Sequence, residues 1–335
     1  MARIAPDRLA PLARLLERFP RSRVVVVGDF VADEYVYGET ERISREAPVL
    51  IVRYERSEVV PGGAGNAAQN LAALGVDVRA VGLVGDDAPG RRLLAELRAG
   101  PVDVRGIQRV RGRATEAKTR ILAGGRSTRR QQMLRVDRTP EPISAAVERR
   151  LVADLKRAAR GAGAVLASDY GSGVLSPRVV QALREIRRGG VPVCVDSRYN
   201  LTGFSGLTML KPNETELEAA SGIRASTPGG LARAAAWLQR HMRCQSLLVT
   251  RGRNGMSLFE KGRPPLHLAA HGDKEAVDVT GAGDTVAATY AAAIASGADP
   301  EGAMRLANVA AALVVQKAGT ATVGRDELRR ELAGA

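Results

Sequence analysis

Short apolar runs alternate with helical segments along most of the chain. Residues 24–27 form an unbroken β-branched run that ends at Gly28-Asp29, a pattern typical of a parallel strand buried on both faces. Residues 78–84 predict the next strand, and from Ala145 onward strands and helices alternate regularly. The pattern therefore predicts a doubly wound α/β domain. Its further strands and helices are expected at residues 67–74, 91–98, 164–167, 179–186, 191–195, 207–210, 214–220, 231–241 and 246–250.

Two segments interrupt this alternation. Residues 35–60 and 102–137 contain no convincing helix and hold short pieces, such as Thr119-Arg120-Ile121-Leu122, that are typical of strands. Because each segment is inserted between α/β units, the two are expected to pair into one small sheet outside the main sheet. That sheet would form a lid over the active edge of the main sheet. Residues 1–335 are then one domain that carries a lid.

The composition is that of a globular protein and argues against a membrane-spanning or secreted one. Hydrophobic residues make up 45% of the 335 residues and charged residues 26%, which is ordinary for a globular protein. No apolar run approaches the roughly 18–20 residues of a membrane span, and the first 20 residues lack the apolar region of a signal peptide. Cys194 and Cys244 lie in apolar, strand-like surroundings and are expected to be reduced. These features predict a cytoplasmic protein with no membrane partner.

The net charge of +14 raises the question of nucleic-acid binding. The excess is mostly arginine spread over many segments, and aromatic residues, which provide stacking surfaces for bases, are only 3%. The charge is therefore interpreted as a solvated surface with a preference for an anionic substrate, and no nucleic-acid partner is expected.

The main candidate for chemistry is the stretch Asp278-Val279-Thr280-Gly281-Ala282-Gly283-Asp284-Thr285. It predicts a tight turn that opens into a helix, where unpaired N–H groups and the helix dipole attract anions. A bare phosphate site would not carry the Asp284 carboxylate, because the two negative charges would repel each other. Amides that stabilise an anion, beside a base that takes a proton from an attacking hydroxyl group, are what phosphoryl transfer to an alcohol requires. The alternative interpretation is that Asp284 only caps the helix.

Polar residues follow several of the predicted strands, where α/β sheets place their ligand groups. Each of them alone could be a helix cap or a turn residue, but together with Asp284 they are expected to meet at one edge of the sheet. Asn213 and Glu216 lie at a helix start on one face, where an amide and a carboxylate suit a hydrated Mg²⁺ that bridges phosphates. The strand-end residues are Asp33, Asp169, Asp196, Lys211, Asn213 and Thr250.

Other motifs are weaker candidates. Residues 63–68 fit the dinucleotide pattern GxGxxA, but they do not follow the first strand directly, as a Rossmann unit requires. The sequence has no Walker A motif, and its three histidines lack the spacing of metal ligands. The turn at residues 278–285 therefore stays the main candidate.

Three motifs resemble the PfkB/ribokinase family of carbohydrate kinases, and the resemblance covers essentially the whole chain. They are Pro-Gly-Gly-Ala-Gly-Asn at 61–66, Asn-Glu-Thr-Glu at 213–216 and Asp-Val-Thr-Gly-Ala-Gly-Asp at 278–284. The resemblance implies a ribokinase-like three-layer α/β/α fold with a mostly parallel central sheet and a small β-sheet lid. It also implies ATP as phosphoryl donor, Mg²⁺, and a homodimer formed through the lid strands, and it leaves open whether a monovalent cation is needed.

The resemblance further implies a role for individual residues. Asp284 is the implied catalytic base, and Gly281, Ala282 and Gly283 form the implied anion hole. Asn213 and Glu216 are the implied residues of the Mg²⁺–phosphate network. The implied nucleotide-binding residues are Asn213, Thr250, Gly252 and Asn308. The implied sugar-binding residues are Asp33, Gly62, Gly63, Asn66, Lys118, Arg120, Gln132 and Asp169.

Within this family the chain is most similar to the heptose 7-phosphate kinases, in residues 41–49, 118–122, 131–137, 168–170 and 317–323. The implied reaction is the ATP-dependent phosphorylation of D-glycero-D-manno-heptose 7-phosphate to the 1,7-bisphosphate. Two sites depart from those kinases, since Ser172 and Ser197-Arg198 stand where they usually carry lysine and Pro-Lys. The alternatives are a kinase for another sugar or sugar phosphate and a non-catalytic sugar- or nucleotide-binding regulator. Asp284 argues against the regulator, because a pure binder needs no base beside an anion site.

Overall fold

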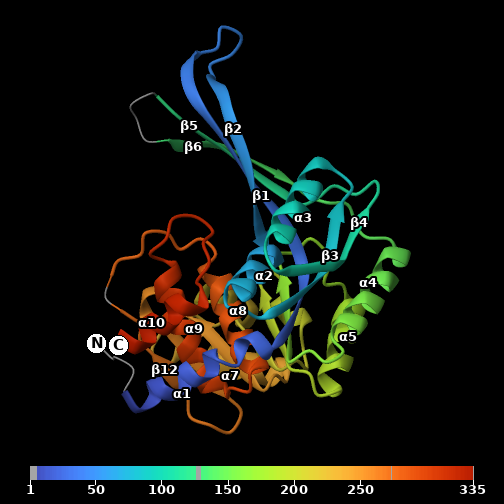
Figure 1. Cartoon of the computed structure of the whole chain (residues 1–335). Helices are drawn as coiled ribbons and strands as arrows, with labels where there is room; N and C mark the ends of the chain where they lie inside the picture. Colours follow the sequence, from blue (N-terminus) through green and yellow to red (C-terminus); the bar gives the residue numbers. More distant parts are fainter. Residues whose placement is uncertain (1–5, 126–129, 273, 335) are drawn as a thin grey trace.

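The structure, a computed structural model, describes residues 6–125, 130–272 and 274–334 (Figure 1). Its strands are β1 (Arg23–Ile43), β2 (Leu50–Gly63), β3 (Asp77–Gly85), β4 (Val102–Val110), β5 (Ala117–Gly124), β6 (Gln131–Arg138), β7 (Ala164–Asp169), β8 (Val193–Ser197), β9 (Met209–Leu210), β10 (Ser246–Thr250), β11 (Met256–Glu260) and β12 (Leu266–Leu268). Its helices are α1 (Pro6–Leu16), α2 (Ala64–Ala73), α3 (Ala88–Ala99), α4 (Ala145–Ala158), α5 (Pro177–Arg188), α6 (Glu214–Ser221), α7 (Gly230–Met242), α8 (Ala282–Ala295), α9 (Pro300–Val314) and α10 (Arg325–Gly334).

The central sheet has the strand order β12-β11-β10-β9-β8-β7-β1-β3-β4. The strands from β10 to β4 pair in parallel, whereas β11 and β12 add an antiparallel edge. Successive side chains of a central strand enter opposite cores: Val24 and Val26 pack on one side of β1, and Val25 and Val27 pack on the other. This burial on both faces explains the continuous β-branched run, and the predicted α/β class is confirmed.

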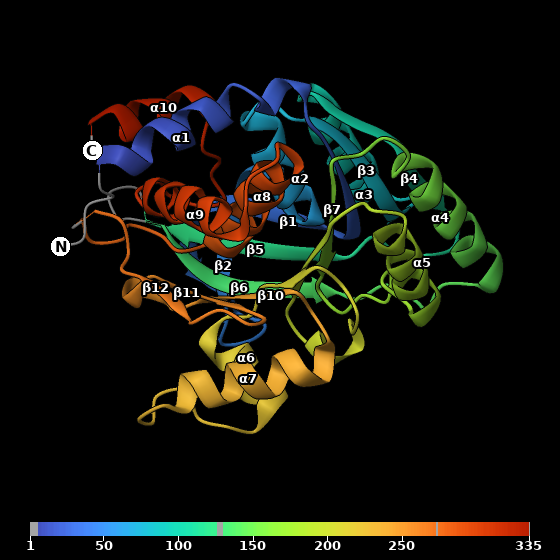
Figure 2. The same cartoon turned by 90° about the horizontal axis from the view of Figure 1, so that it is seen from below.

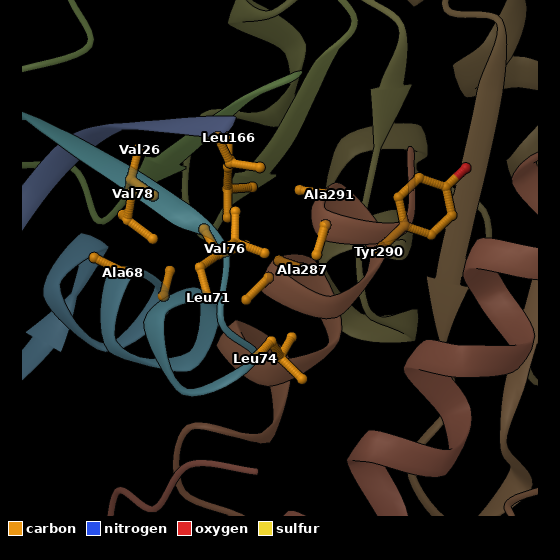
Figure 3. Close-up of a cluster of buried hydrophobic side chains, with 14 of the residues drawn as sticks. Val26, Ala68, Leu71, Leu74, Val76, Val78, Leu166, Ala287, Tyr290 and Ala291 are labelled. Carbon is orange, nitrogen blue, oxygen red and sulfur yellow. The ribbon is translucent and has the colours of Figure 1, made fainter. Parts of the chain in front are cut away.

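Helices cover both faces of the central sheet and make three layers (Figure 2). Helices α1, α2, α3, α8, α9 and α10 contribute to one core, and α4 to α7 contribute to the other. Helix α8 is buried along most of its length, and its small residues Ala287 and Ala291 allow it to lie close to α2 and the sheet (Figure 3). The residues that precede and begin α8 are thereby attached to the buried core of the molecule.

The lid is built on the far half of β1, which leaves the central sheet and extends away from the body (Figure 1). There β1 pairs with β2 in antiparallel and with β5 in parallel fashion, and β5 pairs with β6. At Gly28, where β1 still pairs with β7, a Cβ atom would lie 1.9 Å from the carbonyl oxygen of Ser168, so only glycine fits. One strand thus connects the two sheets and sets how the lid stands over the body.

Two details of the predicted strands differ from the structure. The strand expected at residues 24–27 does not end at Gly28-Asp29 but continues without a break to Ile43. Residues 102–110, expected in the lid, form β4 at the edge of the central sheet. The reason is that Val102, Val104 and Ile107 pack on one core only, so β4 alternates apolar and polar residues as a lid strand does.

Membrane spans and cysteines are the two features of the composition that concern the structure. No helix in the described part of the chain is long and apolar enough to cross a membrane. Cys194 and Cys244 are free and buried, as the sequence suggested, and burial raises the pKa of both thiols.

Candidate active site

The turn before α8 is fixed by backbone amides of the turn itself and of the segment after α9. The Asp278 carboxylate accepts N–H groups of Thr280 and Gly319, each at 2.9 Å, which ties the turn to the segment after α9. The Ala282 amide donates to the Val279 carbonyl at 3.2 Å. Of the three predicted anion-hole amides, that of Ala282 is therefore engaged within the turn.

The two glycines of this turn allow close approach of other groups. Gly281 caps α8 with a φ of 77°, and a Cβ atom there would lie 2.6 Å from Asn66 Nδ2. A Cβ atom at Gly283 would lie 3.6 Å from Lys211 Nζ. An amide from α2 and an ammonium group from the end of β9 thus lie next to the start of α8.

Asp284, in the first turn of α8, is 5% exposed and holds two defined hydrogen bonds. Its Oδ2 accepts Asn66 Nδ2 at 2.7 Å, and its Oδ1 accepts the hydroxyl of Tyr170 at 2.9 Å. Burial, together with the nearby charge of Asp196, raises the pKa of Asp284 to about 7, against the opposing effects of Asn66, Tyr170 and Lys211. A carboxylate with this pKa can accept a proton near neutral pH, as a general base must.

A relay of side chains orients the Asn66 amide. Asn70 Nδ2 donates to Asn66 Oδ1 at 3.0 Å, and the hydroxyl of Thr285 donates to Asn70 Oδ1 at 2.9 Å. With its oxygen so occupied, Asn66 presents its NH₂ group to Asp284. The relay joins α2 to α8, so helix packing fixes the direction of the Asp284 carboxylate.

A buried ion pair lies under the site, where Lys211 Nζ is 2.9 Å from Asp196 Oδ1. Burial opposes the charge on Lys211, but the carboxylates of Asp196, Glu216 and Asp284 raise the pKa of Lys211 overall. Burial also raises the pKa of Asp196, against the attraction of Lys211. The ammonium group beside Gly283 is therefore a permanent positive charge next to the predicted anion hole.

Asp29 anchors the loop that carries Tyr170. Its buried carboxylate accepts three backbone N–H groups, from Tyr170 at 2.8 Å, Ser172 at 3.1 Å and Val174 at 3.3 Å. Gly63 packs against the same strand, with a φ of 56° and a virtual Cβ 2.5 Å from the Asp29 carbonyl oxygen. Together these contacts hold the Tyr170 hydroxyl against Asp284.

The lid contributes charged groups next to Tyr170 and Asp284. Arg120 Nη1 donates to Asp33 Oδ1 at 2.6 Å, and both side chains are largely shielded from solvent. Lys118 Nζ lies 5.5 Å from the centre of the Tyr170 ring, a cation–π distance that brings the lid to the body. A Cβ atom at Gly62 would lie 2.1 Å from Asp33 Oδ2, which explains a glycine there. The structure thus brings Gly63, Asn66 and Lys118 against Tyr170 and Asp284. It also joins Asp33, Gly62 and Arg120 around one ion pair of the lid.

Two residues predicted to bind the sugar make different contacts. Gln132 lies on β6, all of whose residues are exposed, and β6 pairs only with β5 among the described strands. Asp169 is buried and accepts the hydroxyl of Ser197 at 2.6 Å and the Gly171 N–H at 3.2 Å. Both oxygens of Asp169 are therefore used to shape the loop next to Tyr170.

The predicted metal pair forms a capping box at the start of α6. Asn213 Oδ1 accepts the Glu216 N–H at 2.8 Å, and Glu216 Oε2 accepts the Asn213 N–H at 2.9 Å. Among the described hydrogen bonds Glu216 Oε1 is not used, so this oxygen fits a metal-bound water molecule. No cluster of three or more His, Cys, Asp or Glu side chains suited to a metal occurs among the described residues.

Two of the remaining predicted nucleotide residues, Thr250 and Gly252, lie at and just after the end of β10. Thr250 forms a parallel bridge with Asn213, and Gly252 follows in a short turn with a φ of 52°. Asn308 Nδ2 on α9 donates to the Ala269 carbonyl at 2.7 Å. Thr250 and Asn213 are thus neighbours, whereas Asn308 secures the chain that follows β12.

Four functional residues were not assigned a role from the sequence. Asp29 follows the apolar run of β1, Asp196 lies near the end of β8, and Lys211 directly follows β9, so their positions gave a signal without giving their partners. The ion pair between Asp196 and Lys211 connects neighbouring strands β8 and β9, and strand order is not written in the local sequence. Tyr170 was noted as part of Ser168-Asp169-Tyr170, but its hydrogen bond to Asp284 required the fold.

Comparison with known sequences identifies related proteins. The sequence profile described as "pfkB family carbohydrate kinase" matches residues 21–327. The "Bifunctional protein HldE" of Gluconobacter oxydans (strain 621H) is 41% identical over 322 residues, which cover 95% of this chain and 66% of that protein. The protein of the same name from Pelobacter propionicus is 41% identical over 317 residues, 94% of this chain and 64% of that protein. The chain thus spans about two thirds of the length of these relatives.

Solved structures have the same fold. Arabidopsis thaliana ribokinase complexed with ribose and ATP aligns with a TM-score of 0.73 and 26% identity, over 93% of this chain and 98% of that one. Phosphofructokinase-2 from Escherichia coli in complex with potassium aligns with a TM-score of 0.77 and 19% identity, over the same shares of the two chains. The predicted ribokinase-like fold is therefore confirmed.

Proposed function

Because this chain belongs to the pfkB family of carbohydrate kinases, we propose that it transfers the γ-phosphoryl group of ATP to D-glycero-D-manno-heptose 7-phosphate and yields the 1,7-bisphosphate. The kinase activity follows from the family. The heptose substrate is supported by the similarity to heptose 7-phosphate kinases in the sequence and by the 41% identity with the HldE proteins. One observation carries the mechanism: a buried carboxylate with a pKa near 7 at the amide-rich start of a helix.

In this mechanism Asp284 takes the proton of the acceptor hydroxyl group while the hydroxyl oxygen attacks the γ-phosphorus. The bond between that phosphorus and the bridging oxygen breaks, and ADP leaves with the bonding electrons. The amides of Gly281 and Gly283 and the ammonium group of Lys211 stabilise the charge on the transferring group. Asn66 and Tyr170 hold the carboxylate toward the acceptor.

We assign Glu216 to the Mg²⁺ that accompanies ATP, since Mg²⁺ keeps several waters and needs few carboxylates from the protein. Glu216 Oε1 would accept a hydrogen bond from one of those waters, while the capping box holds the side chain still. Asn213 serves mainly to position Glu216 in this proposal. The reaction is placed in the cytoplasm, which supplies ATP and keeps thiols such as Cys194 reduced.

An assay of ADP formation across a panel of sugars and sugar phosphates tests this function. The highest kcat/KM is expected with heptose 7-phosphate, followed by other sugar phosphates, and the lowest with unphosphorylated heptose. A higher kcat/KM with another acceptor would reassign the substrate and leave the kinase mechanism intact. No turnover with any acceptor would favour a sugar- or nucleotide-binding regulator.

Arg120→Ala is expected to raise the KM for the sugar phosphate about 10- to 100-fold, the effect of one charge-assisted hydrogen bond. The KM for ATP should stay nearly unchanged, because Arg120 lies on the lid beside Asp33. Steady-state kinetics with each substrate varied in turn measure both values. Arg53→Ala, which removes a lid arginine paired with Glu41, is the matched control. Equal increases in both KM values would contradict the assignment of this lid face to the sugar.

We also propose that the lid mediates a homodimer. Its exposed apolar residues lie at the β1–β2 tip and on edge strand β6, and they are Ile43, Val49, Leu50, Tyr54, Met133, Leu134 and Val136. The wild type is expected to sediment as a dimer and the Leu134→Asp variant as a monomer. Val277→Asp, at an exposed apolar residue of the body, is the control. A monomeric wild type, or a dimeric Leu134→Asp variant, would rule out this interface.

A further inference from the structure

Glu116, Lys118 and Arg120 lie on one face of the lid, at the start of strand β5 and next to the candidate active site. Glu116 precedes β5 and already pairs with β1, because its carbonyl oxygen accepts the Ala32 N–H at 2.8 Å. Lys118 and Arg120 follow at two-residue intervals, so the three side chains share a face. Lys118 lies over the Tyr170 ring, so this face looks toward the catalytic carboxylate.

Both cations of this face are already neutralised by carboxylates of the protein. Arg120 is held tightly by Asp33 at 2.6 Å. Lys118 Nζ lies 3.7 Å from Glu116 Oε1, which is too long for a strong hydrogen bond. The pair of Lys118 and Glu116 is therefore the weaker of the two and the one that an incoming anion separates more readily. Arg120 can keep its bond to Asp33, because a guanidinium group has further N–H donors for the same anion.

The surroundings of Glu116 can hydrogen-bond with its carboxyl group in both the ionised and the protonated form. The hydroxyl of Ser172 donates to Glu116 Oε2, and a hydroxyl can equally accept a hydrogen bond from a protonated carboxyl group. Burial, opposed by Lys118 and supported by the charges of Asp29 and Asp33, raises the pKa of Glu116 to about 7. The Arg113 guanidinium is also close enough to interact with Glu116.

We propose that Glu116 selects phosphorylated acceptors, by holding Lys118 neutralised until the phosphate group of the sugar replaces it. This inference rests on the proposed function in so far as the acceptor carries a phosphate group. A phosphate offers Lys118 more negative charge and more acceptor oxygens than the carboxylate does. The displaced Glu116 takes a proton from solvent and stays hydrogen-bonded to Ser172. Ser172, which stands where related kinases usually carry lysine, is thus the partner that lets Glu116 change its charge.

The test compares the KM for the acceptor in wild type and Glu116→Gln at pH 6 and pH 8. Glutamine keeps a hydrogen bond to Ser172 but cannot neutralise Lys118. The ratio of wild-type to variant KM is expected to be near one at pH 6, where Glu116 is already protonated. At pH 8 the wild type must take up a proton one unit above its pKa, so the ratio should rise to about tenfold. Taking the ratio removes the titration of the phosphate itself, and the KM for ATP should not change.

Glu34→Gln is the matched control. Glu34 follows Asp33 on β1, so its side chain lies on the other face of the lid, where it contacts Thr119 and Arg92. The ratio of the wild-type KM to the Glu34→Gln KM for the acceptor should stay near one at both pH values. A second variant, Ser172→Lys, places an ammonium group beside Glu116 and should release Lys118, so it too should lower the KM at pH 8.

The assay uses whichever sugar phosphate has the highest kcat/KM in the panel. If that acceptor is not heptose 7-phosphate, the proposed substrate is wrong but Glu116 is tested equally well. A KM ratio for Glu116→Gln that does not change between pH 6 and pH 8 overturns the inference. A higher KM in Ser172→Lys at pH 8, or turnover of unphosphorylated sugars alone, overturns it as well.

Discussion

Replacing Asp284 by asparagine is expected to lower kcat by about 10²–10⁴-fold, the usual contribution of a positioned general base. Asparagine has the same shape, and its amide can still bond with Asn66 and Tyr170, so the fold of the site is kept. The amides of Gly281 and Gly283 and the charge of Lys211 remain in place. ATP should therefore bind as well as before, or slightly better without the nearby carboxylate, and neither KM should change much.

The alternative role of Asp284, as a helix cap, predicts a different result. Asparagine caps a helix about as well as aspartate, so a cap variant would keep nearly normal kcat. The pH profile gives a second readout, since the pKa of Asp284 is about 7 and only its ionised form is a base. Wild-type kcat should fall as pH drops below about 7, and Asp284→Asn should lack this decline. Near-normal kcat in the variant would remove Asp284 from the mechanism.

Local sequence predicted the parts of the fold that local chemistry decides. Buried parallel strands such as residues 164–167 are apolar throughout, and α5 and α7 show the helical period, so both kinds of element were predicted near their true bounds. The edge strand β4 was placed in the lid because it is buried on one face only. The long β1 was cut short because Gly28-Asp29 resembles a strand end, whereas here the glycine lets a continuing strand pass close to β7.

The site could be predicted as a set of residues but not as a network. The turn at residues 278–284 and the strand-end carboxylates were visible, because glycine and carboxylate positions in α/β proteins carry a physical meaning. Asn213 and Glu216 show the limit, since the same two residues that suit a hydrated metal also form a capping box. Which carboxylate faces Tyr170, and which one anchors its loop, depends on contacts between segments more than 100 residues apart.

Lys211→Met is expected to lower the free energy of unfolding by about 3–5 kcal/mol at pH 8, because it leaves a buried charge without its partner. Methionine fills a similar volume, so the loss comes from Asp196, whose carboxylate stays buried next to Asp284. Without the ammonium group the pKa of folded Asp196 should rise further above its value in the unfolded chain. The penalty is thus full at high pH and shrinks as the pH falls and folded Asp196 takes up a proton.

Urea denaturation at pH 8 and pH 5.5 measures this loss, and two controls identify its cause. The double variant Lys211→Met with Asp196→Leu removes both charges and should recover most of the stability, since apolar replacements of buried pairs are often neutral. Lys156→Met breaks a shorter ion pair with Glu185, at 2.6 Å, but one that is exposed, and should have little effect. A Lys211→Met variant as stable as Lys156→Met would show that burial does not set the strength of the pair. Lys211→Met should also change the pH dependence of kcat. Because the charge of Lys211 lowers the pKa of Asp284, its loss should move the fall of kcat at low pH to a higher pH.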